Sequence, residues 1–245
     1  MGGVLTVDQA SYLPNARAFR APVEDGLLAL GFPGGGADQT VRNLARGGLA
    51  DGAIVGTPTF SPFWASFDGP NSALELPQVD LAVASYAVAA RSTTANTSQS
   101  SQPIFMGTFN GSGAAAGSTL YVTSTTVIRG NAATTDGSTT QGHTIDVAAT
   151  PGNWNFLGFD FDNAAQAIRN MTTGAKTSGN HAGGFNARVT NGKNIRVGAG
   201  YASFAGDCDV FFYALYNRRL SDNEWAALYS RIKAIAAGLS SPIAI

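Results

Sequence analysis

The sequence predicts an all-β protein, built as a two-sheet antiparallel sandwich with a short C-terminal helix. Short β-favouring segments alternate with polar, glycine-rich loops along most of the 245 residues, which favours a sandwich over a parallel α/β fold. A chain of this length is commonly a single all-β unit. Hydrophobic residues make up 44% of the chain, which is enough for a core, and only one segment has a convincing helical pattern.

The C-terminal end carries the clearest pattern. An apolar and aromatic run begins at Asp209 (DVFFYALYN) and ends at the turn formed by Arg218 and Arg219. Ser221 follows, with Glu224 three positions later, which is the spacing of a reciprocal capping box. These residues predict a final strand over 209 to 217 and a helix that begins just after Ser221.

The earlier strands are predicted from alternation and from β-branched and aromatic content, with polar or glycine-rich turns between them. In chain order they are Asp80 to Arg91, Pro103 to Phe109, a hairpin over Thr119 to Arg129, His143 to Ala148, Asn155 to Asp162, Gln166 to Thr172 and Asn194 to Gly198. Residues 92 to 102 and 130 to 142 are expected to be polar loops.

Alternation along Asn155 to Asp162 predicts which side chains face the core. Leu157, Phe159 and Phe161 share one face, the core side, because successive residues of a strand point to opposite faces. The residues expected to contribute to the core are Trp154, Phe156, Leu157, Phe159, Phe161, Val210 and Phe212. Cys208, the only cysteine, is expected to be a small buried residue of the last strand, and no intrachain disulfide can form.

Four segments, taken in order, resemble the concanavalin-A-like and laminin-G-like jelly-roll domains. They are Gly26 to Gly56 with the loop around Asn43, Trp64 to Pro77, Asn153 to Asp162, and the closing strand and helix with Tyr216, Asn217, Arg218, Leu220, Ser221, Glu224, Leu228 and Tyr229. In the second segment a Phe-Asp-Gly turn precedes a short strand that ends in proline. The resemblance covers about residues 26 to 236 and implies a concanavalin-A-like two-sheet antiparallel jelly-roll sandwich.

Two parts of the chain are distinguished by this resemblance. It implies a laminin-G-like jelly-roll domain over residues 26 to 245, preceded by an N-terminal arm over residues 1 to 25. The arm has too few apolar residues to fold alone, so it packs on the sandwich or docks on another subunit. Its apolar residues include Leu5, Tyr12, Leu13 and Phe19.

Composition excludes several classes of function. The net charge is −1 and only 13% of residues are charged, so the chain has no excess of positive charge with which to bind the phosphates of nucleic acid. No segment approaches the ~20 apolar residues of a membrane span, so membrane insertion is not expected. The N-terminus lacks the pattern of a secretory signal. His143 and His181 lie in polar, loop-like sequence and are expected to be ordinary solvated side chains, with no Cys/His cluster for zinc.

Catalysis is not expected. Glucanases that share the jelly-roll fold carry Glu-x-Asp-x-x-Glu or a close variant on one strand, and this sequence has no match. The nearest pattern is Asp160 and Asp162, which share a strand face but lack a third carboxylate, and we expect them to face solvent.

A cofactor is not expected. The binding of a structural calcium ion stays an open alternative, because relatives of this fold often bind Ca²⁺ with oxygen ligands at the rim of the sandwich. Oxygen-bearing side chains cluster at residues 68 to 71, at residues 160 to 163, and at Asp207 with Asp209. The chain reads Val-Phe-Phe-Tyr at 210 to 213, where many relatives carry Ile-Asp-Glu-Val, so no ligand set can be assigned.

Carbohydrate binding needs an exposed aromatic ring beside groups that form hydrogen bonds with hydroxyls. Of the three tryptophans, Trp154 aligns with the core tryptophan of the family and Trp225 is expected to pack its helix on a sheet. Trp64 is the least committed to the core. The candidate sugar-binding residues are therefore Trp64, Asp68 and Asn71.

The lectin-like resemblance without an export signal suggests a bacteriophage virion protein. We expect a non-enzymatic component of a tail, fibre or baseplate that attaches to a host-surface glycan or holds the particle together. Its partners would be other virion proteins, and its subunits would form a homo-oligomer such as a trimer, assembled in the host cytoplasm. The alternative is an extracellular carbohydrate-binding or adhesion module of a secreted bacterial protein.

Overall fold

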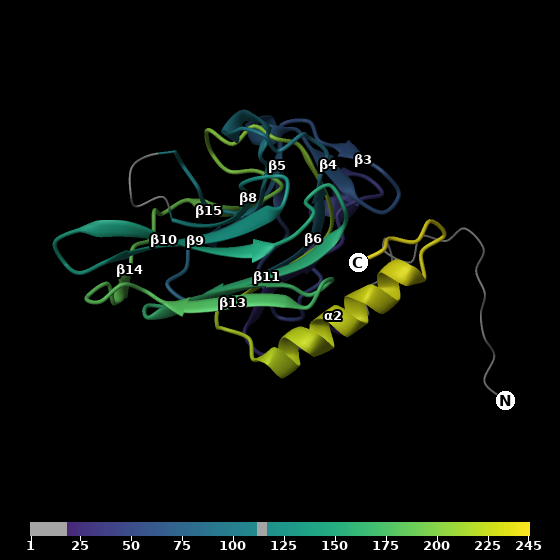
Figure 1. The fold of residues 1–245 in the computed structure, drawn as a ribbon. Helices are drawn as coiled ribbons and strands as arrows, with labels where there is room; N and C mark the ends of the chain where they lie inside the picture. Colours follow the sequence, from purple (N-terminus) through teal and green to yellow (C-terminus); the bar gives the residue numbers. More distant parts are fainter. Residues whose placement is uncertain (1–18, 112–116) are drawn as a thin grey trace.

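Two antiparallel β-sheets stack face to face, and the helix α2 covers the outer face of one of them (Figure 1). The computed structural model describes residues 19–111 and 117–245. Within these residues each sheet has eight strands, and every pairing is antiparallel. The predicted fold class, a two-sheet jelly-roll sandwich with a C-terminal helix, is confirmed.

Sheet A has the order β13-β12-β11-β6-β16-β4-β3, and β1 also pairs with β16. Its strands are β1 (Leu27–Gly31), β3 (Thr59–Phe60), β4 (Ala65–Phe67), β6 (Ala84–Ser92), β11 (Asn155–Phe161), β12 (Ala165–Asn170), β13 (Ala175–Asn180) and β16 (Cys208–Tyr216). The last strand of the chain therefore lies in the middle of the sheet, between strands from the first half of the sequence.

Sheet B has the order β10-β9-β8-β7-β15-β5-β2, and β14 also pairs with β9. Its strands are β2 (Ala53–Val55), β5 (Ala73–Val79), β7 (Ile104–Gly107), β8 (Ser118–Val122), β9 (Val127–Thr135), β10 (Thr140–Ala148), β14 (Ala187–Arg188) and β15 (Asn194–Val197). The predicted hairpin over residues 119 to 129 is the β8–β9 pair.

The helix α2 (Asp222–Ala237) begins where the capping box predicts. Ser221 Oγ accepts a hydrogen bond from the backbone N–H of Glu224 at 3.4 Å, and the Ser221 N–H donates to Glu224 Oε2 at 2.8 Å. Two otherwise unpaired donors of the first turn are thereby satisfied. The described residues also form a one-turn helix, α1 (Ala37–Thr40), and two 3₁₀ turns, η1 (Gly69–Asn71) and η2 (Gln99–Ser101).

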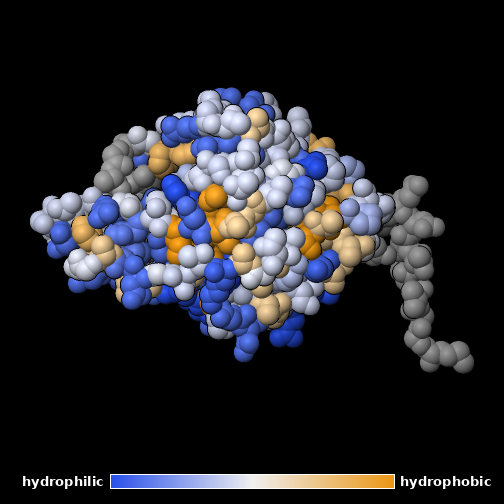
Figure 2. All heavy atoms as spheres, in the orientation of Figure 1, coloured by the Kyte–Doolittle hydropathy of each residue, from blue (hydrophilic) through white to orange (hydrophobic). Residues whose placement is uncertain are grey.

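The main core lies between the two sheets. Leu157, Phe159 and Phe161 of β11 are fully buried there, as their alternation predicts, together with Val210 of β16. On the side in view in Figure 2, hydrophilic and intermediate residues cover most of the surface, and apolar residues gather near the middle.

A second core lies between sheet A and α2. Phe156 and Phe212 from the sheet pack there against Trp225 of the helix, and all three are fully buried. A β-bulge in β16 separates the pairs Val210↔Ala90 and Phe212↔Ala89, so Phe211 and Phe212 both lie on the helix side. Because sheet A is covered on both faces, β16 is apolar and aromatic along nearly its whole length rather than alternating.

The described part of the predicted N-terminal arm packs on this second core. The Phe19 ring lies 5.4 Å from the Phe32 ring, Ala21 and Val23 are buried, and the Tyr216 hydroxyl donates to the Val23 carbonyl at 3.3 Å. Leu5, Tyr12 and Leu13 lie outside the described residues, so the assembly role of residues 1 to 25 stays a prediction.

Two local predictions are wrong. Residues 130 to 142 are not a long loop, because β9 and β10 pair across most of this segment and only residues 136 to 139 turn. Asp136 Oδ1 caps that tight turn by accepting from the N–H groups of Ser138 and Thr139. Pro77 does not end a strand either: it lies inside β5, at an irregularity between the pairs Val79↔Asn194 and Glu75↔Arg196, where its missing N–H is tolerated.

No helix within residues 19–111 and 117–245 is long and apolar enough to cross a membrane.

Candidate functional site

Trp64 is held at the start of β4 by a tight turn. The Ser61 N–H donates to the Trp64 carbonyl at 2.9 Å, and Ser61 Oγ accepts from the N–H groups of Phe63 and Trp64. Gly34 packs directly on this turn: a Cβ there would lie 2.5 Å from the Trp64 nitrogen, and the φ of Gly34 is +137°. The turn leaves the Trp64 ring half-buried, at the edge of the helix-bearing side of sheet A.

Trp154 meets Trp64 at this edge. Their ring centres are 5.8 Å apart at an interplanar angle of 66°. Trp154 lies between β11 and the turn of residues 150 to 153, which the Asn155 side chain fixes by donating to the carbonyls of Thr150 and Asn153. The prediction that Trp154 contributes to the core holds only in part: Trp154 packs against the second core but is half-buried, because it precedes the first residue of β11.

Arg91 completes the group from the end of β6. Its guanidinium lies 5.0 Å from the Trp154 ring centre and 5.6 Å from the Trp64 ring centre. These are distances for cation–π contact, which fixes the two rings and the arginine relative to one another. We call Trp64, Trp154, Arg91 and the pocket beside them the Trp64–Trp154 site.

The pocket has a volume of about 350 Å³, and its lining combines apolar surface with polar side chains. Besides Arg91 and Trp154 it is bordered by Thr150, Asn153 and Thr172 and by Ala244 of the C-terminal tail. The Asn153 side chain is exposed and makes no hydrogen bond to any residue of the described chain. The site therefore offers amide, hydroxyl and guanidinium groups next to aromatic rings.

The charge of Arg91 is compensated. Arg91 Nε and Nη2 each lie 2.8 Å from Asp209 Oδ2, and Ser66 Oγ donates to Asp209 Oδ1 at 2.6 Å. The Asp209 side chain is 5% exposed, so this pair belongs to the sheet rather than to solvent. A guanidinium has five N–H donors, so Arg91 keeps further N–H groups for a ligand while the site stays close to neutral.

Asp68 and Asn71, the other two predicted sugar-binding residues, lie away from Trp64. Trp64 precedes the three-residue strand β4 and Asp68 follows it, so their backbones are separated by about 13 Å at the usual rise of a strand. Asp68 and Asn71 are exposed around η1, where Asn71 N donates to the Asp68 carbonyl at 2.9 Å. The structure brings Asp68 close to Asp207 instead.

Asp68 and Asp207 are the described carboxylates that best suit a hard cation. Burial raises the pKa of Asp207, and the neighbouring Asp68 carboxylate raises it further. A cation between the two groups would relieve their repulsion. However, the described residues contain no group of three or more His, Cys, Asp or Glu side chains placed to hold a metal ion, so a structural calcium stays an open prediction.

Asp160 and Asp162 do share a strand face, but they do not face solvent as an unpaired couple. Asp160 is 1% exposed and is paired with both Arg169 and Arg219; Arg219 also binds Asp162 at 3.1 Å. Burial raises the pKa of Asp162, but hydrogen bonds from backbone N–H groups and from Arg219 outweigh it, so the net pKa is lowered. Both carboxylates are thus engaged as ion-pair partners.

Asp222 extends this network to the first turn of α2. It accepts from Arg169 at 3.1 Å and from Lys176 at 2.8 Å. The ion pairs therefore tie β11, β12 and β13 to the start of the helix, and we assign them a structural role.

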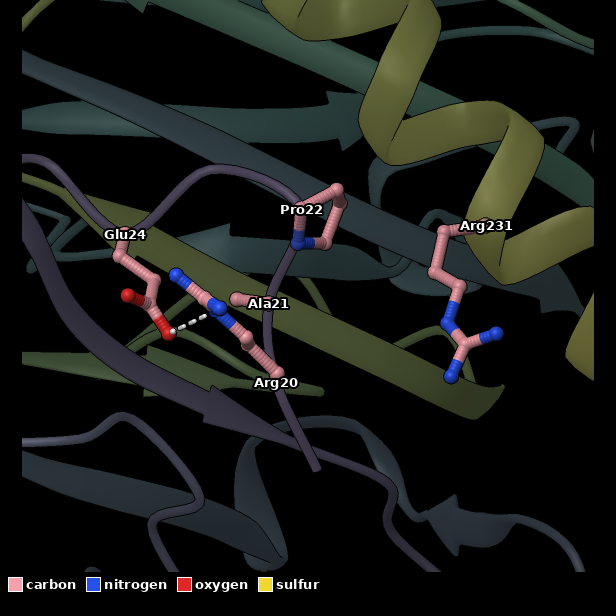
Figure 3. A pocket seen from close by; sticks show the side chains of 5 residues that line it. All are labelled: Arg20, Ala21, Pro22, Glu24 and Arg231. Atoms are coloured by element: carbon pink, nitrogen blue, oxygen red, sulfur yellow. Dashed lines mark ion pairs between the residues drawn. The ribbon is translucent and has the colours of Figure 1, made fainter. Parts of the chain in front are cut away.

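A further hollow of about 490 Å³ lies between the N-terminal segment and α2 (Figure 3). Arg20, Glu24 and Arg231 border it, and Arg20 pairs with Glu24 at 3.4 Å. Arg20 is 83% exposed and Arg231 is also exposed. These are solvated surface arginines, and we assign no ligand to the hollow.

Sequence reasoning missed two members of the Trp64–Trp154 site. Arg91 ends the apolar segment DLAVASYAVAAR, and a charge at the end of such a segment indicates the rim of a sheet. Trp154 follows Pro-Gly-Asn, a turn sequence, which also indicates a rim position. What the sequence does not show is that these two rims meet, because their contact depends on the strand order of sheet A.

No protein-family model matches this sequence, and no curated protein sequence matches it either. Solved structures do. The binding domain of botulinum neurotoxin serotype G superimposes with a TM-score of 0.57 at 10% identity, over 76% of this chain and 48% of that chain. The ligand-binding domain of serotype D, solved in complex with N-acetylneuraminic acid, gives a TM-score of 0.59 at 10% identity, over 85% of this chain and 52% of that chain.

The binding domain of botulinum neurotoxin DC, solved in complex with rat synaptotagmin II, gives a TM-score of 0.52 at 9% identity, over 76% of this chain and 48% of that chain. This chain spans about half the length of these neighbours. The likeness shows a shared fold, a lectin-like jelly-roll β-sandwich.

Proposed function

We propose that this chain is a non-enzymatic, lectin-like binding module that takes a cell-surface glycan at the Trp64–Trp154 site. The observation that carries the proposal is the meeting of two half-buried tryptophans and an arginine at the rim of sheet A, beside a pocket with both apolar and polar lining. The structural neighbours support a binding role, since they are binding domains, and one was solved with N-acetylneuraminic acid.

The chemistry of the site suits a sugar ring. One face of a pyranose carries C–H groups that pack on an aromatic ring, and its edge carries hydroxyls that need donors and acceptors. Trp154 supplies the apolar surface. Asn153 supplies an unbonded amide, and Arg91 supplies N–H donors that Asp209 does not use.

The charge balance favours an uncharged sugar. The Arg91 guanidinium is already paired with a nearly buried carboxylate, so an acidic sugar would gain little from it. We therefore expect neutral hexoses or N-acetylhexosamines to bind better than sialic acid, in contrast to the ligand of the serotype D neighbour.

The non-enzymatic part of the proposal is supported by the state of the carboxylates. Asp160 and Asp162 are engaged by Arg169 and Arg219, and no carboxylate lines the pocket of the Trp64–Trp154 site. Glycoside hydrolysis needs an acid and a second carboxylate on opposite sides of the scissile bond. We expect the purified protein to release no sugar from β-glucans; release that disappears in Asp160→Asn or Asp162→Asn protein would contradict this.

The biological setting is a separate proposal that rests on the sequence. A phage tail, fibre or baseplate protein, assembled in the host cytoplasm and contacting other virion proteins, is our first choice. A secreted extracellular adhesion module is the second. The toxin neighbours support the binding role in either setting and do not favour the virion. Finding capsid and tail genes next to the coding sequence would favour the virion.

A glycan array with matched variants tests the binding proposal. Trp154→Ala and Asn153→Ala should each weaken binding, Trp154→Ala by about 3- to 10-fold, the scale of one aromatic contact. Asn71→Ala, at the other end of β4, is the control and should leave binding unchanged. The site is refuted if the array is positive and only Asn71→Ala weakens it, and the function is refuted if no glycan binds to folded wild-type protein.

A further inference from the structure

The two histidines of the chain, far apart in the sequence, touch one another in the fold. His143 lies on β10 of sheet B, and His181 directly follows β13 of sheet A. Their ring centres are 4.8 Å apart at an interplanar angle of 46°, and Phe185 packs against His143 at 5.3 Å. His181 is only 8% exposed, so the expectation that both are ordinary solvated side chains is wrong. Strand order, which brings β10 against β13, explains the contact.

One nitrogen of each ring is buried without a hydrogen-bond partner in the described structure. These atoms are His143 Nε2 and His181 Nδ1. Buried polar atoms in proteins are nearly always bonded, and an exception needs a physical explanation such as an ion. The two unpartnered nitrogens are shielded from water, but the His143 ring is only partly buried, so solvent reaches the edge of the pair.

The other nitrogen of His181 is oriented as in a metal ligand. His181 Nε2 lies 3.1 Å from the Asp162 carbonyl oxygen, and a carbonyl can only accept, so Nε2 carries the proton. The lone pair then lies on Nδ1, the unpartnered atom. Metal-bound imidazoles typically donate their second N–H to a carbonyl in this way. The backbone at Asp162 is itself held in place, because the N–H groups of Ala164 and Ala165 donate hydrogen bonds to the Asp162 side chain.

The ring separation fits a shared ion. An ion at 2.0–2.1 Å from one nitrogen of each imidazole places the two ring centres roughly 4.5–5.2 Å apart, depending on the angle at the metal. The 4.8 Å separation lies within this interval. Imidazole nitrogen suits Zn²⁺, Ni²⁺ and Cu²⁺, whereas Ca²⁺ and Mg²⁺ prefer oxygen.

We propose that His143 and His181 form a binding site for one divalent transition-metal ion, with water completing its coordination. The ion would link β10 of sheet B to the end of the β12–β13 hairpin of sheet A. Because it would bind the folded chain and not the separated histidines, it would stabilise the sandwich.

The charges around the pair limit its affinity. Imidazole, with an ordinary pKa of about 6.5, is mostly neutral at pH 7.5 and can bind a metal there. The positive charges of Arg188 and Arg219 act on His181 and oppose a cation, while the Asp162 carboxylate attracts one. Because the site has only two protein ligands and nearby charges of both signs, we expect it to bind a metal ion more weakly than a structural zinc site does.

Calorimetric titration of the tag-free, full-length protein with ZnCl₂ and NiCl₂ tests the proposal. Wild-type protein should bind one ion per chain, and CaCl₂ should give no such isotherm. His143→Gln and His181→Gln should each lose at least about tenfold in affinity, because removing one of two ligands leaves a single imidazole. Phe185→Leu, which changes a neighbour of His143 without removing a ligand, should still bind.

Unchanged binding in either histidine variant, two ions per chain, or no binding to the wild type would each overturn the site. If a variant fails to fold, NMR of wild-type protein with labelled histidines decides: one equivalent of Zn²⁺ should shift His143 Nε2 and His181 Nδ1 together. A shift of one ring alone would also overturn the proposal.

Discussion

Gly158 in β11 should be intolerant of even one added methyl group, because the largest side chain of α2 packs directly on it. A Cβ built at Gly158 lies 2.7 Å from Trp225 Cζ3 and 2.8 Å from Cη2, closer than real Cβ contacts come. Trp225 is fully buried between the helix and sheet A, so it has no free space into which to move. Gly158→Ala must therefore push α2 away from the sheet or force Trp225 into a strained rotamer.

Overpacking of this kind costs typically about 1–3 kcal/mol. For a domain of this size each kcal/mol lowers the melting temperature by roughly 2–4 °C, so we expect a fall of about 2–12 °C. The assay is thermal unfolding followed by circular dichroism. Gly179→Ala is the matched control: Gly179 is also in a strand of sheet A, but a Cβ there meets nothing within 4 Å, so the melting temperature should hardly change.

A second-site change makes the test specific. Trp225→Leu alone should destabilise the protein by removing buried area, but in the Gly158→Ala background part of the loss should be recovered, because the smaller side chain leaves room for the methyl group. The two substitutions should thus be non-additive, as contacting residues are. A Gly158→Ala protein as stable as wild type, or strictly additive losses, would refute the packing of α2 described above.

Three further predictions concern the ends of the domain. Ser221→Ala should lower the free energy of unfolding by roughly 0.5–2 kcal/mol in urea titrations, through loss of the N-cap, while Ser221→Asp should retain most of it. The Arg218 ion pair and the Ser221 N–H lower the pKa of Glu224 to about 2. The ionised Glu224 side chain therefore stabilises the fold above its unfolded pKa of about 4.3, and this stabilisation is lost as the pH falls toward 2. Glu224→Gln should flatten the dependence of the free energy of unfolding on pH over that interval, and an unchanged slope would contradict the pairing. Deleting residues 1 to 18 should leave a folded monomer but weaken any oligomer, as a lower mass in light scattering. Deleting residues 1 to 25 should also reduce the free energy of unfolding, because Val23 and its neighbours pack on the second core. Equal masses for full-length and shortened protein would mean that the arm packs only on its own sandwich.

Local patterns predicted the parts of the fold whose causes are local. The capping box at Ser221 predicted the start of α2 to the residue, and the alternation of Leu157, Phe159 and Phe161 predicted the face that lines the main core. The β9–β10 hairpin was missed because its strands consist largely of Thr, Ala, Gly and Asn. Such residues show little hydrophobic alternation, and they are held by cross-strand pairing that the sequence does not display.

The candidate sites depended on contacts that no local pattern contains. Trp64 is half-buried, but so is Trp154, and the partners of Trp64, Arg91 and Trp154, come from the ends of two other strands. His143 and His181 looked like loop residues because each is surrounded by small polar residues. Their meeting follows from the side-by-side placement of β10 and β13, which is a property of topology rather than of either segment.

The central position of β16 has a consequence for how the chain must fold in time. β16 pairs with β6, β4 and β1, all from the first 92 residues, yet it begins only at Cys208 and is therefore synthesised long after them. During translation those strands must wait, with their apolar faces and unpaired edges exposed, until residue 216 has left the ribosome. Contacts between residues this far apart in the sequence slow folding and prolong the exposure of aggregation-prone strands. The chain is therefore expected to need chaperone protection while nascent, and premature termination before Cys208 should give aggregates rather than a smaller folded domain.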